Sequence, residues 1–283
     1  MNGSEPNHHV VTSGQMPTPP AVGPLTPETA AFYRRMIGEL LQTDVPFLVG
    51  GAYALARYAG IERHTKDFDI FVRPHDAVRT LNVLRRAGCE SELTFSHWLG
   101  KAWCGDDFVD VIFSSGNGIA DVDDEWFAHA LDDTVLGIPV RLVPPEEMVW
   151  SKAFVMERER FDGADINHLL LHMADALDWH RLLRRFGTHW PVFLAHVTLF
   201  RFAYPSAAHR VPQWLMEDLL NRARQAQPEV DGLGPVCRGT ILSRQQYLVD
   251  IEDWGFRDGR LVPNGTMSGS EIAAWTNAID TIP

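Results

Sequence analysis

The sequence predicts an α+β fold, in which a mixed sheet flanked by helices is followed by a helical C-terminal half. Three observations predict this class. Residues 46–72, PFLVGGAYALARYAGIERHTKDFDIFV, have the pattern of a strand, a glycine turn, a short helix and a second strand. The run FVDVIF at 108–113 alternates like another strand. From residue 144 to the mid-220s the apolar spacing is helical.

The length, charge and apolar content of the chain exclude some classes of function. The chain has 283 residues and 45% hydrophobic content, enough for one large domain or two modest ones. Its formal net charge of -12 argues against extended nucleic-acid binding, because phosphate contacts need clustered Lys and Arg, but it leaves a local tRNA contact open. No run is long and apolar enough to span a membrane, and no signal peptide is visible. We expect no membrane partner.

The cysteines indicate the compartment. Cys89, Cys104 and Cys237 are far apart in the sequence and odd in number. This usage fits buried thiols in a reducing compartment better than a disulfide framework or a zinc site. We therefore expect a cytoplasmic protein.

Four segments are expected along the chain. Residues 1–27 are rich in proline and poor in large apolar residues, which is typical of a disordered arm. An α/β domain follows at 28–143, then a helical domain at 144–227 and an irregular segment at 228–283. Thr26 and Pro27 have the residue types of a helix N-cap and first helical position.

Individual elements follow from periodicity and turn residues. In the α/β domain we expect helices at Thr29–Gln42, His75–Ala87 and Asp121–Leu131, and strands at Cys89–Phe95, Phe108–Phe113 and twice within Thr134–Val143. The run PPEEMVWSKAFVMERERF at 144–161 predicts one long helix with an acidic first turn. Further helices are expected at Ala164–Ala176, Asp178–Phe186, His189–Phe202 and Pro212–Ala226.

Three carboxylates are the candidate catalytic and metal-binding residues. Asp67 and Asp69 are two positions apart at the start of a strand, so their side chains point to the same face. Asp110 lies within the FVDVIF strand, either isolated on an apolar face or pointing into a site. A cluster of three acids on a sheet suits one or two Mg²⁺ ions, which prefer oxygen ligands and keep positions open for substrate phosphates.

The residues around these acids suggest a phosphate site. Gly50 and Gly51 end the first strand and begin a helix, where backbone N–H groups can approach phosphate oxygens closely. Arg63 and Lys66, in the charged turn before Asp67, are candidate nucleotide contacts. The same turn could instead neutralise the two acids without any metal. Taken together, the glycine turn, paired acids and third acid describe metal-assisted phosphoryl or nucleotidyl transfer.

These motifs resemble the nucleotidyltransferase superfamily with the DNA polymerase beta-like fold. The matching features are Val49-Gly50-Gly51, Asp67-Phe68-Asp69 and Asp110 within FVDVIF. The resemblance covers roughly residues 45–113. It implies that the first two acids bind metal and that the third helps the metal and activates the acceptor hydroxyl.

Further along, the chain resembles abortive-infection toxin-type nucleotidyltransferases. The matches are Ser151-Lys152-Ala153-Phe154 and the segment Arg160-Phe161-Asp162-Gly163-Ala164-Asp165-Ile166. This resemblance implies that Lys152 contacts nucleotide phosphates and that Asp165 supports it or the acceptor site. The helical half also resembles, in architecture, that of small antibiotic nucleotidyltransferases.

The predicted reaction moves a nucleoside monophosphate from an NTP to a hydroxyl acceptor, with Mg²⁺ (two ions) as cofactor and pyrophosphate as product. A small molecule, a tRNA end and a protein side chain all stay open as the acceptor. Two rivals remain: a non-catalytic nucleotide- or partner-binding module of a toxin–antitoxin type system, and a metal-dependent phosphohydrolase using the same acids. The sequence leaves the oligomeric state open.

Overall fold

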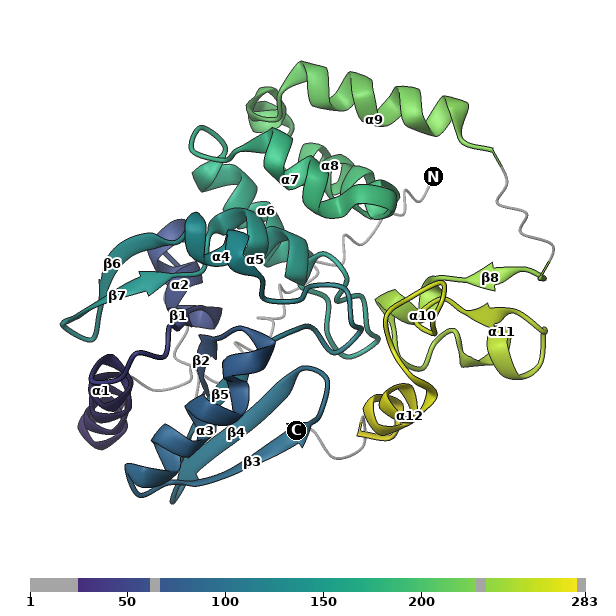
Figure 1. Cartoon of the computed structure of the whole chain (residues 1–283). Helices are drawn as coiled ribbons and strands as arrows, with labels where there is room; N and C mark the ends of the chain where they lie inside the picture. The colour runs from purple at the N-terminus through teal and green to yellow at the C-terminus, as the bar shows by residue number, and fades with distance from the viewer. Residues whose placement is uncertain (1–24, 62–66, 228–232, 279–283) are drawn as a thin grey trace, which may run out of the picture.

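The computed structural model describes residues 25–61, 67–227 and 233–278 (Figure 1). Its main sheet has seven strands in the order β3-β4-β5-β2-β1-β7-β6. The strands are β1 (Leu48–Val49), β2 (Asp67–Phe71), β3 (Glu90–Phe95), β4 (Leu99–Cys104), β5 (Asp107–Ile112), β6 (Leu131–Val135) and β7 (Ile138–Leu142). β2 runs parallel to β5 and β1 parallel to β7, while the other neighbours are antiparallel. The predicted mixed sheet flanked by helices is confirmed.

The helices of the sheet domain are α1 (Pro27–Leu41), α2 (Gly51–Ala59), α3 (Ala77–Arg86) and α4 (Asp124–Ala128), with a 3₁₀ turn at Pro74–Asp76. Thr26 is the N-cap of α1 as predicted, since its side chain accepts a hydrogen bond from the Thr29 backbone N–H. The buried face of α1 brings Tyr33 onto Phe68 of β2, with ring centroids 4.9 Å apart. This contact holds α1 against the face of β2 on which Phe68 lies.

Two predicted elements differ in the sheet domain. The helix expected at Asp121–Leu131 is shorter, because Leu131 already belongs to β6. The strand β4 was missed altogether. Its sequence LGKAWC contains Gly100 and has no clear alternation, so only its pairing with β3 and β5 reveals it.

The helical half comprises α5 (Pro145–Lys152), α6 (Gly163–Met173), α7 (Trp179–Phe186), α8 (Trp190–Ala203) and α9 (Gln213–Gln225). The prediction of one long helix over 144–161 is wrong, because α5 ends at Lys152. The chain then turns back on itself: the Asp162 backbone N–H bonds to the Val155 carbonyl, and Met156 forms an isolated bridge with Phe161. The four later helices are confirmed to within a few residues.

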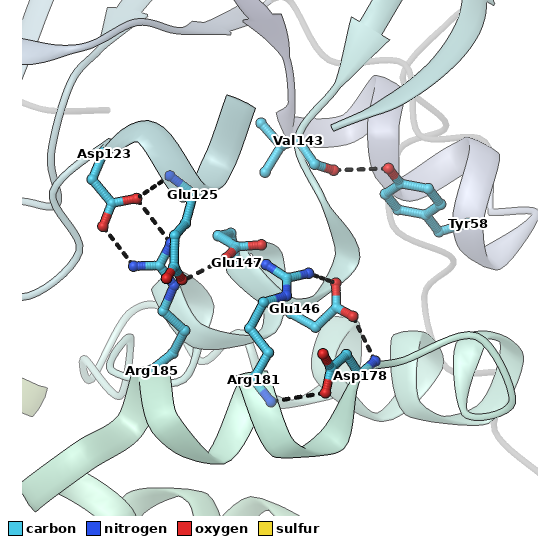
Figure 2. A network of polar contacts seen from close by, with 9 residues as sticks. All are labelled: Tyr58, Asp123, Glu125, Val143, Glu146, Glu147, Asp178, Arg181 and Arg185. Atoms are coloured by element: carbon cyan, nitrogen blue, oxygen red, sulfur yellow. Dashed lines mark hydrogen bonds and ion pairs between the residues drawn. The ribbon is translucent and has the colours of Figure 1, made fainter. Parts of the chain in front are cut away.

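A buried charge cluster joins α7 to α5 and α4 (Figure 2). Arg181 of α7 forms ion pairs with Glu146 and Glu147 of α5. Arg185 pairs with Glu147 at 3.0 Å and with Asp123, at the N-terminus of α4, at 2.6 Å. Arg181, Glu146 and Glu147 are buried, whereas Asp123 lies at the surface with 47% of its side chain exposed.

The C-terminal residues fold into short elements beside the sheet domain: β8 (Val236–Cys237), α10 (Gly239–Leu242), α11 (Leu248–Glu252), β9 (Arg257–Asp258) and α12 (Gly269–Asn277). Trp275 of α12 packs on Phe95 and Trp98 of the β3–β4 hairpin. The Asn117 side chain donates to the Ile241 carbonyl at 2.8 Å. The segment thus docks on the hairpin and on the Gly/Ser-rich loop after β5.

No helix among the described residues is both long enough and apolar enough to cross a membrane.

Candidate active site

The three predicted acids lie on two neighbouring parallel strands. In the register of β2 and β5, Asp69 is directly opposite Asp110, and Asp67 is opposite Phe108. Phe68 and Ile70 alternate with the acids of β2 and are buried on the other side. Asp67, Asp69 and Asp110 therefore share the more open face of the sheet, as the alternation predicted.

The glycine turn lies against this acidic face. The Gly50 backbone N–H donates to the Asp69 carbonyl at 3.0 Å, at the junction of β1 and α2. Gly51 has φ +54°, and a Cβ added there would overlap the Asp69 carboxylate. Only glycine permits both the left-handed backbone and this close approach. The two motifs that were noted separately in the sequence are one structural unit.

The carboxylates raise one another's proton affinity. The pKa of Asp69 is raised from 3.8 to about 7, chiefly by burial and then by the charges of Asp110 and Asp67, while Lys152 and Arg160 act in the opposite direction. The pKa of Asp110 is also raised, mainly by burial. Such like-charge crowding with a raised pKa is characteristic of functional sites.

Lys101 is a residue of this site that sequence reasoning missed. It lies on β4 opposite Asp110, and its Nζ forms an ion pair with Asp110 Oδ1 at 2.9 Å. The lysine opposes the rise in the Asp110 pKa. Recognising it required β4, which has no clear strand pattern.

Lys152 and Asp165 are brought together as the resemblance implied. Lys152 Nζ donates to Asp165 Oδ2 at 2.9 Å and to Asp162 Oδ2 at 2.8 Å. Arg160 makes two hydrogen bonds to Asp162, at 2.8 and 2.9 Å. Burial would raise the pKa of Asp162, but Arg160 and Lys152 outweigh it and lower the pKa to about 2. Asp162 and Arg160 thus belong to the site, although only Lys152 and Asp165 were predicted.

This second cluster adjoins the acidic face. The charges of Lys152 and Arg160 both favour ionised Asp69, and Asp69 in turn raises the pKa of Arg160. Arg63 and Lys66, the remaining predicted nucleotide contacts, lie outside the described residues.

The donor set fits a divalent cation that is shared with a substrate. Among residues 25–61, 67–227 and 233–278, no three or more His, Cys, Asp or Glu side chains are arranged to hold a metal by themselves. Mg²⁺, however, commonly takes one or two carboxylates and completes its shell with water and substrate phosphates. Asp67 and Asp69 are oxygen donors of this kind, and a cation beside them would relieve the repulsion that raises the Asp69 pKa.

A cavity of about 340 Å³ lies elsewhere, between the end of α1 and the β6–β7 hairpin. Its lining includes Leu41, Phe47, Phe127 and Arg141, but none of the candidate residues.

No known family model matches the sequence, and no curated protein matches it. Solved structures that resemble the fold include the antibiotic-resistance factor ANT(2'')-Ia, with 15% identity, a TM-score of 0.44, and coverage of 60% of this chain and 96% of that one. An antigenic nucleotidyltransferase-like protein from Paracoccidioides brasiliensis has 15% identity, a TM-score of 0.41, and coverage of 67% and 96%. The lincosamide antibiotic adenylyltransferase LnuA has 13% identity, a TM-score of 0.37, and coverage of 51% and 96%.

By their names, LnuA is an adenylyltransferase and the Paracoccidioides protein is nucleotidyltransferase-like. None of the three is named as an abortive-infection toxin, so that closer resemblance stays a prediction. At these identities and TM-scores the likeness transfers no activity to this chain.

Proposed function

We propose that this protein transfers a nucleoside monophosphate from an NTP to an acceptor hydroxyl and releases pyrophosphate. The observation that carries the proposal is the pairing of Asp69 with Asp110 across parallel strands, with the Gly51 backbone against the Asp69 carboxylate. The helix N-terminus at Gly51, a type of backbone that suits phosphate, lies next to the crowded acids. That combination suits a substrate that brings both phosphates and a divalent cation.

The chain's own residues divide the work between binding and proton transfer. Gly50, whose N–H bonds to the Asp69 carbonyl, positions the turn, and Gly51 with the first turn of α2 offers backbone N–H groups to the triphosphate. Lys152, fixed by Asp162 and Asp165, adds a positive charge near Asp69. Arg63 and Lys66 remain candidate nucleotide contacts from the sequence.

Asp67 and Asp69 would hold Mg²⁺. We propose two ions, with Asp110 as a further ligand. When bound, the cation neutralises charge on the phosphates and lowers the pKa of a coordinated hydroxyl. Asp110 also suits the role of proton acceptor for the hydroxyl. Its Oδ1 is occupied by Lys101, which favours the ionised form and leaves Oδ2 to take the proton.

The acceptor we favour is a small hydroxyl-bearing molecule. The net charge of -12 disfavours a long nucleic-acid partner, because such a partner needs clustered Lys and Arg along its phosphates. A short tRNA end and a protein side chain are the other acceptors to compare.

The first test is thermal denaturation with each of ATP, GTP, CTP and UTP, with and without Mg²⁺. Ligand at about 100 times its Kd stabilises the native state by about 2.7 kcal/mol, which is a shift of several degrees for a chain of this size. We expect a Mg²⁺-dependent shift in the wild type that Asp69→Asn loses. Asp106→Asn, which removes the same charge from the exposed turn between β4 and β5, is the matched control and should keep the shift.

A labelled NTP then separates the rival functions. Label from the α-phosphate on an acceptor, together with released pyrophosphate, supports nucleotidyl transfer. Release of orthophosphate without labelled acceptor would show a phosphohydrolase instead. A nucleotide-dependent shift without any product would show a binding module, and no shift with any nucleotide would overturn the proposal.

A further inference from the structure

Two of the three cysteines are neighbours in the sheet although 89 and 104 are far apart in sequence. β3 and β4 are antiparallel, with Glu90 opposite Trp103 and Ser91 opposite Ala102. Continuing this register by one residue places Cys89 opposite Cys104, the last residue of β4. Directly opposite residues in an antiparallel pair have Cα atoms about 4.5–5.5 Å apart, within the range that a disulfide spans.

The two thiols have different surroundings. Cys89 is buried, and its Sγ lies 3.4 Å from Met36 Sδ. Cys104 is partly exposed, and the Arg35 guanidinium donates to its Sγ at 3.7 Å. A neighbouring guanidinium stabilises a thiolate, which is the reactive form of cysteine. The Cys104 thiol also donates to the Gly88 carbonyl at 3.4 Å. Because Cys104 is partly exposed and Cys89 is buried, Cys104 is the thiol that an oxidant in solution reaches first.

Cys89 has the properties of the second, resolving thiol. Burial raises its pKa to about 12, and contact with the Cys104 thiol adds to this rise. Its thiol stays protonated, and its proton leaves only when its sulfur bonds to the oxidised sulfur of Cys104. The third cysteine, Cys237, is buried on β8 in the C-terminal segment and takes no part in this pair.

We propose that Cys89 and Cys104 form a reversible disulfide, making the base of the β3–β4 hairpin a redox-modification site with a peroxide as oxidant. The Cys104 thiolate attacks one oxygen of hydrogen peroxide, the O–O bond breaks, and the departing hydroxide takes a proton to become water. The sulfur of Cys89 then attacks the Cys104 sulfenic acid, the S–O bond breaks, and a second water leaves with the thiol proton. The two sulfurs together lose two electrons, and the peroxide is reduced to two waters.

The disulfide would connect redox state to the candidate site without touching it. The bridge would close the hairpin at the end of β4, three residues after Lys101, the residue that pairs with Asp110. It would also remove the Cys104 acceptor from Arg35 of α1. The site is independent of the proposed transferase activity, so its test needs no substrate.

The experiment treats the folded full-length protein with hydrogen peroxide, then unfolds it and alkylates the remaining thiols. The reduced protein has three alkylatable cysteines, and we expect one after oxidation, Cys237. The unalkylated mass should fall by about 2 Da, a peptide linking Cys89 to Cys104 should appear, and dithiothreitol should restore all three thiols. Cys237→Ser should form the same bridge.

Two variants test the roles of the two thiols. Cys89→Ser should stop at a Cys104 sulfenic acid that dimedone traps. Arg35→Met should slow oxidation several-fold, whereas Arg34→Met, on the adjacent exposed position of α1, should not. Circular dichroism before treatment establishes that each variant is folded. Three thiols still alkylatable after peroxide, or a bridge that involves Cys237 or a second chain, would overturn the proposal.

Discussion

Helix α5 separates two charge clusters with opposite character. At its start, Glu146 and Glu147 contact guanidinium groups of α7, and Arg181 lies between them (Figure 2). Beyond its end is the acidic face, where Asp69 lies opposite Asp110. Among the side chains that the structure describes, none forms an ion pair with Asp69, and Asp110 has Lys101. Glu146 and Glu147 each have a guanidinium partner, although the pKa of buried Glu147 is still raised. Asp69 receives only the more distant charges of Lys152 and Arg160.

The different charge environments indicate different roles for the two clusters. A buried, compensated cluster joins helices, and its charges are costly only when a partner is removed. An uncompensated carboxylate is costly in the native state itself, and the raised pKa of Asp69 is the measure of that cost. Native proteins keep such a group where a ligand supplies the missing charge. The comparison therefore fits a structural role for the first cluster and the ligand-binding role proposed above for the second.

Breaking the compensated cluster should have the largest effect. Arg181→Met leaves two buried glutamates without their shared partner, and we expect a loss of about 4 kcal/mol in the free energy of unfolding, measured in urea. Arg184→Met, an exposed position on the same helix, should change it by less than about 0.5 kcal/mol. A loss as small as that of Arg184→Met would show that the cluster does not hold α7 in place.

The glycine turn gives the next largest effect. Gly51→Ala combines a left-handed backbone with overlap on the Asp69 carboxylate, and we expect a loss of about 3 kcal/mol. In an Asp69→Ala background the overlap with the carboxylate is gone, so the same substitution should cost about 1 kcal/mol for the backbone alone. The double-mutant cycle in chemical denaturation measures this coupling. Additive losses would mean that Gly51 and Asp69 do not touch.

Neutralising Asp69 should stabilise the protein, whereas the two preceding substitutions destabilise it. Its pKa is 3.8 as the ordinary value and about 7 in the folded state, so the folded state binds more protons between these values. Stability therefore falls as pH rises through this window, and the whole penalty is present above pH 7. Asp69→Asn removes the penalty. We expect it to stabilise the protein by about 2 kcal/mol at pH 8, below the full linkage value because the side chain is partly open to solvent.

The same variant should show little gain at pH 3, below the ordinary pKa of 3.8, where Asp69 is mostly protonated in both the folded and the unfolded state. Asp106→Asn is the control for loss of one negative charge and should be neutral at both pH values. A variant that is no more stable than the wild type at pH 8 would contradict the raised pKa.

Features that depend on neighbouring residues in the sequence could be predicted, whereas contacts between distant segments could not. The strands that bear Asp67, Asp69 and Asp110 were predictable because alternation is local, and parallel pairing then placed the acids together. The turn at Gly50 and Gly51 was predictable as a turn, but its contact with Asp69 was not, since it depends on pairing between β1 and β2.

The misses have a common physical cause. The helix expected over 144–161 stops at Lys152 because Lys152 bonds to Asp162 and Asp165, which requires the chain to fold back. Helical propensity continues through this segment, and tertiary charge pairing overrides it. Likewise Lys101 and Cys104 acquire partners only through β4, whose sequence carries no strand signal of its own.

Lys101 offers the smallest and most discriminating test, since it is the one described ion-pair partner of the acidic face. Lys101→Met keeps the aliphatic stem and removes the charge, so the pKa of Asp110 should rise further. Because ionised Asp110 then loses its partner, we expect a loss of about 1 kcal/mol at pH 8 and almost none at low pH, where Asp110 is protonated. Lys101→Arg keeps the charge and should retain the pH dependence of the wild type. Equal losses for Lys101→Met at both pH values would show that Lys101 acts by packing over the Phe108 ring, 4.4 Å from Nζ, and that Asp110 is as uncompensated as Asp69.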